Sequence, residues 1–526
     1  MPECPDNSNT SESNDGACAC FGISHEASTP RRAFVGAAGL AALASLLGGR
    51  RASATARQPR ATRLGRDYVI DASWALVMVD GAPALRPDVS VRVRDDRVVA
   101  VSMTRLRGTM PRLDARGMLL LPGFISGHTH AASGSSTRGL IEGGRSYQRP
   151  LELVEQLSDS ELDDLTAYNV AELVRSGCTS HVEMSLSLRQ AQSYVRVARR
   201  WYVRGFPGGM IPGTARLFPI WRRRTDQPLL DSVPDTLAEI DANRRFALSV
   251  NGAEDGRIRP MLSPHAADTH TPETLRAIVA AARDVGNGIH THLAQGAGEV
   301  RAVERLWGQR PAAWWHAAGA MDAPFFGAHM TAATSEDWTL LARTGGVYAH
   351  CPSAGGAGAS GGSQPYPEAL AAGVRANIGI DTHSNDYLEN LKLAVLYGRA
   401  RARLLAPPTG PAPRPPTVRD AVDGATIVAA EGLRRTDLGR IAVGAKADLC
   451  AIDVSGFFVG SGVPGPEPLH ALLYANGSAV QHVVTDGYVQ VRHGRLLVDD
   501  ELAIRRRGGA VMQRLWQQLR DERWFE

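Results

Sequence analysis

The stretch LLLPGFISGHTH, Leu119 to His130, ends an apolar run with two histidines one residue apart. In a strand, the side chains at positions i and i+2 lie on the same face, so His128 and His130 project together and are placed to bind one metal ion. The alternative is that both make ordinary hydrogen bonds at the wet mouth of a barrel. The pair alone does not choose between these two interpretations.

The residues after this stretch alternate between helix and strand signals. Segments with capping residues that end at glycine, such as 158–177 and 271–286, are each followed by a short apolar strand that finishes in polar residues. Polar residues at the carboxyl ends of successive strands are what a (β/α)8 barrel needs for its active site. A doubly wound open sheet is the alternative, but no G-x-G-x-x-G motif follows the first strand. We therefore predict an α/β fold with a (β/α)8 TIM barrel.

Two β-rich regions flank this alternating region. Both are rich in Val, Ile and Leu and are broken by Gly, Pro and Asp, which predicts strands joined by turns. We predict four parts after the N-terminal segment: the first half of a small β-sandwich domain (62–120), the barrel (121–435), the second half of the β-sandwich (436–498) and a C-terminal helix (499–526). Residues 201–230 should form a strand and a long loop that lines the pocket. The C-terminal helix either packs on the barrel or makes a subunit contact in a homo-oligomer.

The first 54 residues differ from the rest of the chain. Arg31 and Arg32 precede an uncharged Ala, Gly and Leu run that ends at Gly49, and an Ala-Ser-Ala cleavage candidate follows at 52–54. The run is shorter and richer in glycine than the ~20 apolar residues of a spanning helix. We expect a twin-arginine type signal that exports the protein to the periplasm or the medium, without a stable membrane anchor. A disordered tail with a chance arginine pair is the alternative.

The amino-acid composition limits the classes of partner that the protein can have. The chain has 526 residues, 44% of them hydrophobic, and a net charge of only +4. Its basic residues are interspersed with acidic ones, which argues against a nucleic acid partner and leaves a small-molecule substrate. Cys178, Cys351 and Cys450 follow the proposed cleavage point, and this odd number does not suggest a disulfide framework.

The predicted strand ends carry many possible metal ligands. In chain order they are His128, His130, His181, Glu183, His265, His290, His292, His329, His350 and Asp381. A barrel would bring these ends around one cavity. Imidazole and carboxylate ligands with an open position suit Zn²⁺ or Fe²⁺ and a bound water that is nucleophilic near neutral pH.

The ordered motifs PGFISGHTH, PHAADTHTPE, IHTHLAQ, FFGAHMTAAT and GIDTHSND resemble the amidohydrolase superfamily, in particular its cytosine, guanine and S-adenosylhomocysteine deaminases and triazine hydrolases. The similarity runs from about Tyr68 to Leu497. The resemblance implies metal ligation by His128, His130, His292 and Asp381. It implies that His329 hydrogen-bonds the attacking water or the substrate, that Asp381 takes the proton of the water, and that His265 and Arg138 contact substrate. His290 should pack or support a ligand.

The lysines bear on the number of metal ions. Binuclear members of this superfamily bridge two metals with a carboxylated lysine on a strand between the first histidine pair and the third histidine. Lys392 and Lys446 are the only lysines in the chain, and both follow Asp381. We therefore expect one divalent ion, Zn²⁺ or Fe²⁺.

One residue departs from the family pattern. Where the branch carries a glutamate that shuttles a proton to the ring nitrogen of the substrate, this chain has Gln295. An amide cannot relay a proton near neutral pH. Either another group supplies this proton, with His383 in GIDTHSND as the candidate, or the reaction does not need it. His383 could equally orient the substrate through a hydrogen bond.

These observations predict a mononuclear metal-dependent hydrolase that acts on a non-peptide C–N bond of a small nitrogen heterocycle, by deamination. Hydrolysis of a cyclic amide or lactam is the alternative that Gln295 favours. A non-catalytic binding scaffold is the second alternative.

Overall fold

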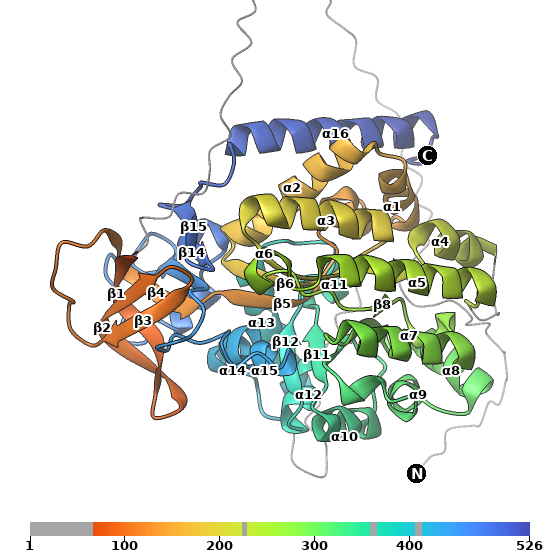
Figure 1. Ribbon diagram of the computed structural model, residues 1–526, viewed down its shortest axis with the longest axis horizontal. Coiled ribbons are helices and arrows are strands. Elements are labelled where there is room, and N and C mark those ends of the chain that lie inside the picture. Colours follow the sequence, from red (N-terminus) through yellow and green to blue (C-terminus); the bar gives the residue numbers. More distant parts are fainter. Residues whose placement is uncertain (1–66, 224–228, 358–364, 405–412) are drawn as a thin grey trace, which may run out of the picture.

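The computed structural model describes residues 67–223, 229–357, 365–404 and 413–526 (Figure 1). The predicted signal segment, residues 1–54, lies outside the described residues. None of the described helices is both long and apolar enough to cross a membrane.

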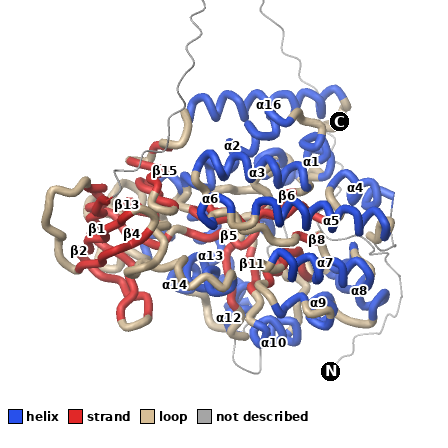
Figure 2. The backbone as a smooth tube through the Cα atoms, viewed as in Figure 1, coloured by secondary structure: helices blue, strands red, loops and turns tan. Residues whose placement is uncertain are grey.

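Eight parallel strands form a closed barrel, and helices surround it (Figures 1 and 2). The strands are β5 (Phe124–Thr129), β6 (Cys178–Ser185), β7 (Arg204–Ile211), β8 (Ser263–Pro264), β9 (Ile289–Leu293), β10 (Phe325–His329), β11 (Val347–His350) and β12 (Arg375–Ile378). Strands β5 to β8 pair in chain order, as do β9 to β12, and parallel bridges join Leu262 to Ile289 and Thr129 to Asp381. These two bridges close the ring, which confirms the predicted TIM barrel.

The helices follow the strands as the capping signals predict. Helix α2 begins with a capping box between Ser158 and Glu161, and α7 begins after Thr271 with proline at its first position. The helices are α1 (Gln148–Glu155), α2 (Asp159–Arg175), α3 (Leu188–Trp201), α4 (Thr214–Arg223), α5 (Val233–Val250), α6 (Ala253–Gly256), α7 (Pro272–Val285), α8 (Ala297–Trp307), α9 (Pro311–Ala317), α10 (Ser335–Thr344), α11 (Pro352–Ala357), α12 (Tyr366–Ala371), α13 (Tyr387–Leu404), α14 (Val418–Asp423), α15 (Ala429–Gly432) and α16 (Glu501–Asp521).

The segment after β7 differs from the prediction. Residues 201–230 were expected to form a strand and a long loop, but Trp201 ends α3 and residues 214–223 form helix α4. Pro219 lies inside this helix, and a proline at such a position is the usual sign that a helix has ended. The apolar residues Leu217 and Phe218 lie on its buried side, so tertiary packing outweighs the local signal.

Both ends of the chain build one β domain, as predicted. Its strands are β1 (Asp67–Val79), β2 (Ala82–Arg94), β3 (Arg97–Ser102), β4 (Arg112–Pro122), β13 (Leu449–Asp453), β14 (Val480–Thr485), β15 (Tyr488–Arg492) and β16 (Arg495–Leu496), in the order β16-β15-β14-β13-β4-β1-β2-β3. The first and last parts of the chain meet where β4 pairs antiparallel with β13. One buried cluster draws residues from strands on both sides of this junction, such as Val91 and Val484, so the sheet curls around its core.

The C-terminal helix packs on the barrel helices. Val511, Leu515 and Leu519 of α16 lie in one buried cluster with Leu162 and Leu165 of α2. Figure 1 shows α16 lying along α2 and α1. The packing alternative of the prediction therefore holds for this face of the helix.

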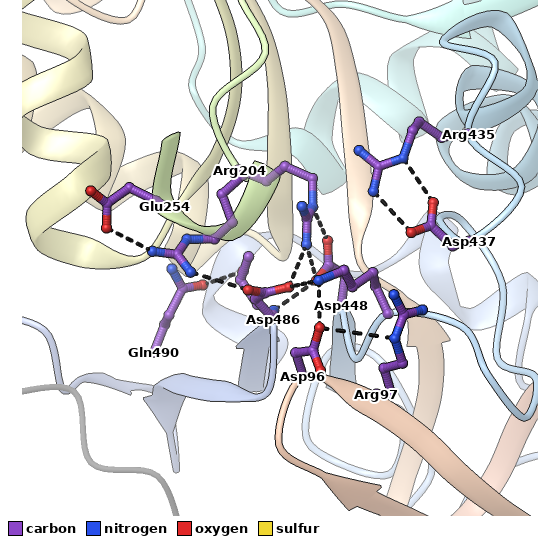
Figure 3. A network of polar contacts seen from close by, with 12 residues as sticks. Asp96, Arg97, Arg204, Glu254, Arg435, Asp437, Asp448, Asp486 and Gln490 are labelled. Atoms are coloured by element: carbon purple, nitrogen blue, oxygen red, sulfur yellow. Dashed lines mark hydrogen bonds and ion pairs between the residues drawn. The ribbon is translucent and has the colours of Figure 1, made fainter. Parts of the chain in front are cut away.

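A buried ion-pair network joins the β domain to the barrel (Figure 3). Arg204, at the start of β7, donates from Nε to Asp448 Oδ2 at 2.7 Å and from Nη2 to Asp486 Oδ1 at 2.9 Å. Lys446 Nζ and Arg257 Nη1 also donate to Asp486, at 2.9 and 3.1 Å. The Arg204 side chain is fully buried. The two domains are thus held together by charges that water does not screen.

We predict that Arg204→Ala lowers the free energy of unfolding by about 3–5 kcal/mol, because it leaves the buried carboxylate of Asp448 without its cationic partner and removes one of the cations around Asp486. Urea denaturation followed by circular dichroism measures this. The control is Arg92→Ala, which removes the partly exposed pair with Asp67 and should change stability by about 0–1 kcal/mol. Equal effects of the two substitutions would contradict the role given to Arg204.

Candidate metal centre

Four strand ends bring five polar side chains together at the carboxyl face of the barrel. They are His128 from β5 and His130 directly after it, His292 from β9, His329 from β10 and Asp381 after β12. Each histidine is at most 7% exposed. Their possible ligand atoms form two groups, each within 4.8 Å: one of His128, His292 and His329, and one of His128, His130 and Asp381. The four residues expected to bind the metal therefore lie together, with His329 beside them.

Asp381 lies close to three of the four clustered histidines. Its Oδ1 is 3.1 Å from His130 Nε2 and 3.6 Å from His128 Nε2, and its Oδ2 is 4.0 Å from His329 Nε2. Burial by itself would raise the pKa of Asp381, but the imidazoles of His128 and His130, and then that of His329, bring it well below the usual range. The carboxylate is therefore ionised, as a metal ligand must be.

His128 is oriented by a second histidine. His128 Nδ1 and His290 Nε2 are 2.7 Å apart, and both side chains are completely buried. His128 Nε2 has no hydrogen-bond partner in the described protein. Burial lowers the pKa of His128 to about 3, so the ring is neutral and carries one N–H. If that N–H is on Nδ1 and donates to His290, the lone pair of His128 Nε2 points to the cluster and is free for a metal.

Backbone carbonyls orient the other two histidine ligands. His130 Nδ1 lies 2.5 Å from Met184 O, and His292 Nδ1 lies 2.8 Å from His265 O. A carbonyl only accepts, so each Nδ1 is the N–H donor and each Nε2 faces the cluster. Metal-binding histidines are commonly fixed in this way. Three oriented imidazoles and one carboxylate fit a divalent metal ion with an open position.

The backbone is strained at the same place. Ala294, His329 and Asp381 have φ angles of 43°, 74° and 58°, in the left-handed region that non-glycine residues rarely adopt. Each follows or ends a barrel strand. Such conformations persist only where the surrounding structure fixes them, and they cluster at functional sites.

The expected substrate contacts differ in their surroundings. The His265 ring lies 5.0 Å from the His292 ring, and His265 Nδ1 is buried without a partner among the described residues. Gln295 is fixed through its backbone, which donates to Glu299 Oε2 at 2.7 Å and accepts from Thr331 Oγ1. His383 lies two residues after Asp381, is 8% exposed, and its Nδ1 has no described partner.

Arg138 is engaged elsewhere. Its Nη1 and Nη2 donate to Glu172 at 2.9 and 2.8 Å, and its Nε donates to His383 O at 3.1 Å. A cavity of about 730 Å³ lies beside this pair, and none of the five clustered side chains lines it. In this structure Arg138 therefore fixes the backbone of His383.

Two buried glutamates support the site loops. Glu183 accepts hydrogen bonds from Ala131 N at 2.9 Å and from Thr129 Oγ1, which fixes the end of β5. Glu299 lies in the first turn of α8 and holds Gln295 N. Burial and the nearby charge of Asp268 raise the pKa of Glu299 to about 8. Sequence analysis did not single out Glu299, although an acidic residue in the first turn of a helix that follows β9 is a capping signal.

Comparison with known proteins gives a consistent result. The Amidohydrolase family matches residues 119–489. Two relatives named 5-methylthioadenosine/S-adenosylhomocysteine deaminase are each 30% identical: one from Haloarcula marismortui over 457 residues (82% of this chain, 96% of the relative) and one from Moorella thermoacetica over 400 residues (73% and 84%).

Solved structures share the fold. An atrazine chlorohydrolase from Arthrobacter aurescens TC1, complexed with zinc, has a TM-score of 0.71 at 20% identity and covers 85% of this chain and 100% of its own. An adenosine deaminase from Xanthomonas campestris with bound zinc has a TM-score of 0.70 at 22% identity, with coverage of 86% and 99%.

We predict that His290→Phe lowers zinc affinity by about 10–100-fold, because His128 loses the group that orients it. Competition with a chromophoric chelator measures this affinity. The control is His181→Phe, at a fully buried histidine that contacts Tyr194 and belongs to neither ligand group. The assignment is wrong if both variants bind zinc as tightly as the wild type.

Proposed function

The chain belongs to the amidohydrolase family, and we propose that its metal centre removes an amino group from a small nitrogen heterocycle by hydrolysis of a C–N bond. The observation that carries this proposal is the convergence of His128, His130, His292 and Asp381, with each histidine oriented so that Nε2 faces the cluster. The deaminases among the relatives support the reaction class.

The proposed cofactor is one divalent ion, Zn²⁺ first and Fe²⁺ as the alternative. Three imidazole nitrogens and a carboxylate suit both ions. Zinc in the two solved relatives supports the first choice. The absence of a lysine before Asp381 supports a single ion. When bound, the ion would make a water molecule nucleophilic near neutral pH and polarise the carbon under attack.

Asp381 and His329 would handle the proton of the attacking water. Asp381 is ionised and can accept this proton on Oδ2, the oxygen that faces His329 Nε2 at 4.0 Å. Burial lowers the pKa of His329. A neutral His329 can hydrogen-bond either the water or the substrate.

Deamination of the heterocycle needs a proton on its ring nitrogen, and Gln295 cannot relay that proton. We propose His383 as the donor, because it lies two residues after Asp381 and has a ring nitrogen without a described partner. Arg138 holds the His383 backbone in place. Hydrolysis of a cyclic amide is the second candidate function, since that reaction does not need protonation of a ring nitrogen and Gln295 favours it.

Export is a separate proposal. It is supported by Arg31 and Arg32, the uncharged run after them and the Ala-Ser-Ala sequence at 52–54.

We predict that Asp381→Asn lowers turnover at least about 100-fold, because an amide cannot accept the proton of the water. Circular dichroism should show an unchanged fold. The same substitution at the exposed Asp322 is the control and should leave turnover unchanged. Residual activity of Asp381→Asn above a few per cent would contradict its role.

The proton donor can be tested by rescue. We expect zinc-loaded wild type to release ammonia from members of a panel of amino-substituted purines, pyrimidines, pterins and triazines. His383→Gln should lower this release by about 10²–10⁴-fold. Gln295→Glu should restore much of it in the double variant, because a glutamate at this position can relay a proton again.

Other outcomes separate the alternatives. Ammonia from Gln295→Glu but none from wild type favours a cyclic amide as the natural substrate. No metal binding, even after refolding with Zn²⁺ or Fe²⁺, favours a non-catalytic scaffold. Normal release from His383→Gln would exclude His383 as the donor.

A further inference from the structure

Three aromatic side chains form a wall beside the metal centre. Tyr147 precedes α1, and Phe218 and Trp221 lie on α4. The Phe218 and Trp221 rings are stacked at 5.3 Å, and the Tyr147 ring lies 6.4 Å from Phe218 and 6.2 Å from Trp221. We call these three residues the aromatic wall. Figure 1 shows α1 and α4 on the same side of the barrel.

The aromatic wall reaches the proposed metal ligands through one residue. The Trp221 ring lies 5.4 Å from the His265 ring, at an interplanar angle of 72°. The His265 ring in turn lies 5.0 Å from the ring of His292. A molecule held at the metal centre beside His265 would therefore lie within reach of Trp221.

The surroundings of the aromatic wall are apolar. Its members share a cluster with buried residues from β6 and β7 or directly after β6, from α1 and α4, and from the segment before α5: Leu151, Met184, Leu186, Met210, Leu217 and Leu229. The ion pair between Arg222 and Glu152 marks where the polar surface begins.

Phe218 is 2% exposed, whereas Tyr147 and Trp221 are half-buried. Phe218 thus serves as packing for α4, and the other two rings keep accessible surface. Half-buried aromatic rings next to a reactive centre offer a face for stacking a planar ligand.

We infer that the aromatic wall sets the substrate class of the proposed deaminase: a planar aminoheterocycle with an apolar substituent that packs on Trp221, in preference to a ribosylated one. This inference rests on the proposed function. A sugar carries hydroxyl groups that need hydrogen-bond partners when they are buried, and neither the face of a tryptophan ring nor the aliphatic side chains packed in its cluster supply them. His265 Nδ1 remains to bind a polar atom of the ring.

A matched pair of substrates tests this inference. 9-Propyladenine and adenosine have the same ring and amino group and differ only in the substituent on N9. We expect wild type to have at least a tenfold higher kcat/KM for 9-propyladenine. Trp221→Ala should bring this ratio close to one, mainly through KM, and Trp221→Phe should keep most of it because a ring is retained. The control is Trp307→Ala, which removes a half-buried tryptophan that stacks on Trp314 at the end of α8.

Binding is measured separately from turnover with 9-propylpurine, which lacks the amino group, by isothermal titration calorimetry. Suppose that 9-propylpurine binds to wild type and not to Trp221→Ala, and that neither 9-propyladenine nor adenosine releases ammonia. This result would support the aromatic wall as the binding site of the substituent and would contradict the proposed deaminase activity. Suppose instead that ammonia is released but the ratio of kcat/KM for 9-propyladenine to that for adenosine is one or less in wild type, or is unchanged in Trp221→Ala. This result would contradict the role of the aromatic wall and would agree with the proposed deaminase activity. Neither binding nor release would overturn both.

Discussion

The closure of the barrel between β5 and the segment after β12 is the contact on which the site depends. Ile380 N and Asp381 N donate to His128 O at 2.9 and 3.2 Å, and His130 N donates to Asp381 O at 3.4 Å. These bonds join residues that are about 250 positions apart and bring their ligand atoms together. Gly379 permits the approach, because a Cβ there would lie 2.9 Å from His128 Cβ. The left-handed backbone of Asp381 then places its carboxylate among the histidines.

Opposite ends of the barrel serve different purposes. At the start of β7, Arg204 is paired with carboxylates of the β domain. At the carboxyl ends of the strands, by contrast, ring nitrogens of the site have no hydrogen-bond partner among the described residues. This contrast is clear in Arg204, whose Nε and Nη2 bond buried carboxylates, and in His128 and His329, whose Nε2 atoms bond no described group. Buried ring nitrogens without hydrogen-bond partners lower the stability of the folded protein, and a metal ion bound to them would compensate for this loss.

The fold was accessible from the sequence because it follows local rules: capping residues, glycine after helices and polar residues at strand ends. The ligand set was chosen among those strand-end residues through the resemblance to the amidohydrolase superfamily. Contacts between distant segments were not. The i and i+2 spacing of His290 and His292 does not say that His290 would meet His128 from β5. The TRGL motif does not say that Arg138 would pair with Glu172. Because Pro219 lies inside helix α4, the sequence predicted a loop there, and the placement of the α4 aromatic residues beside His265 was missed. Each of these depends on tertiary packing between segments far apart in the chain.

The most direct test of a single metal ion held by these residues is zinc X-ray absorption spectroscopy on the zinc-loaded protein. The account predicts nitrogen and oxygen neighbours at about 2.0–2.2 Å, with imidazole scattering from three histidines. His292→Ala should remove one of the imidazoles. A second metal at about 3.5–4 Å, or sulfur at about 2.3 Å, would contradict the account.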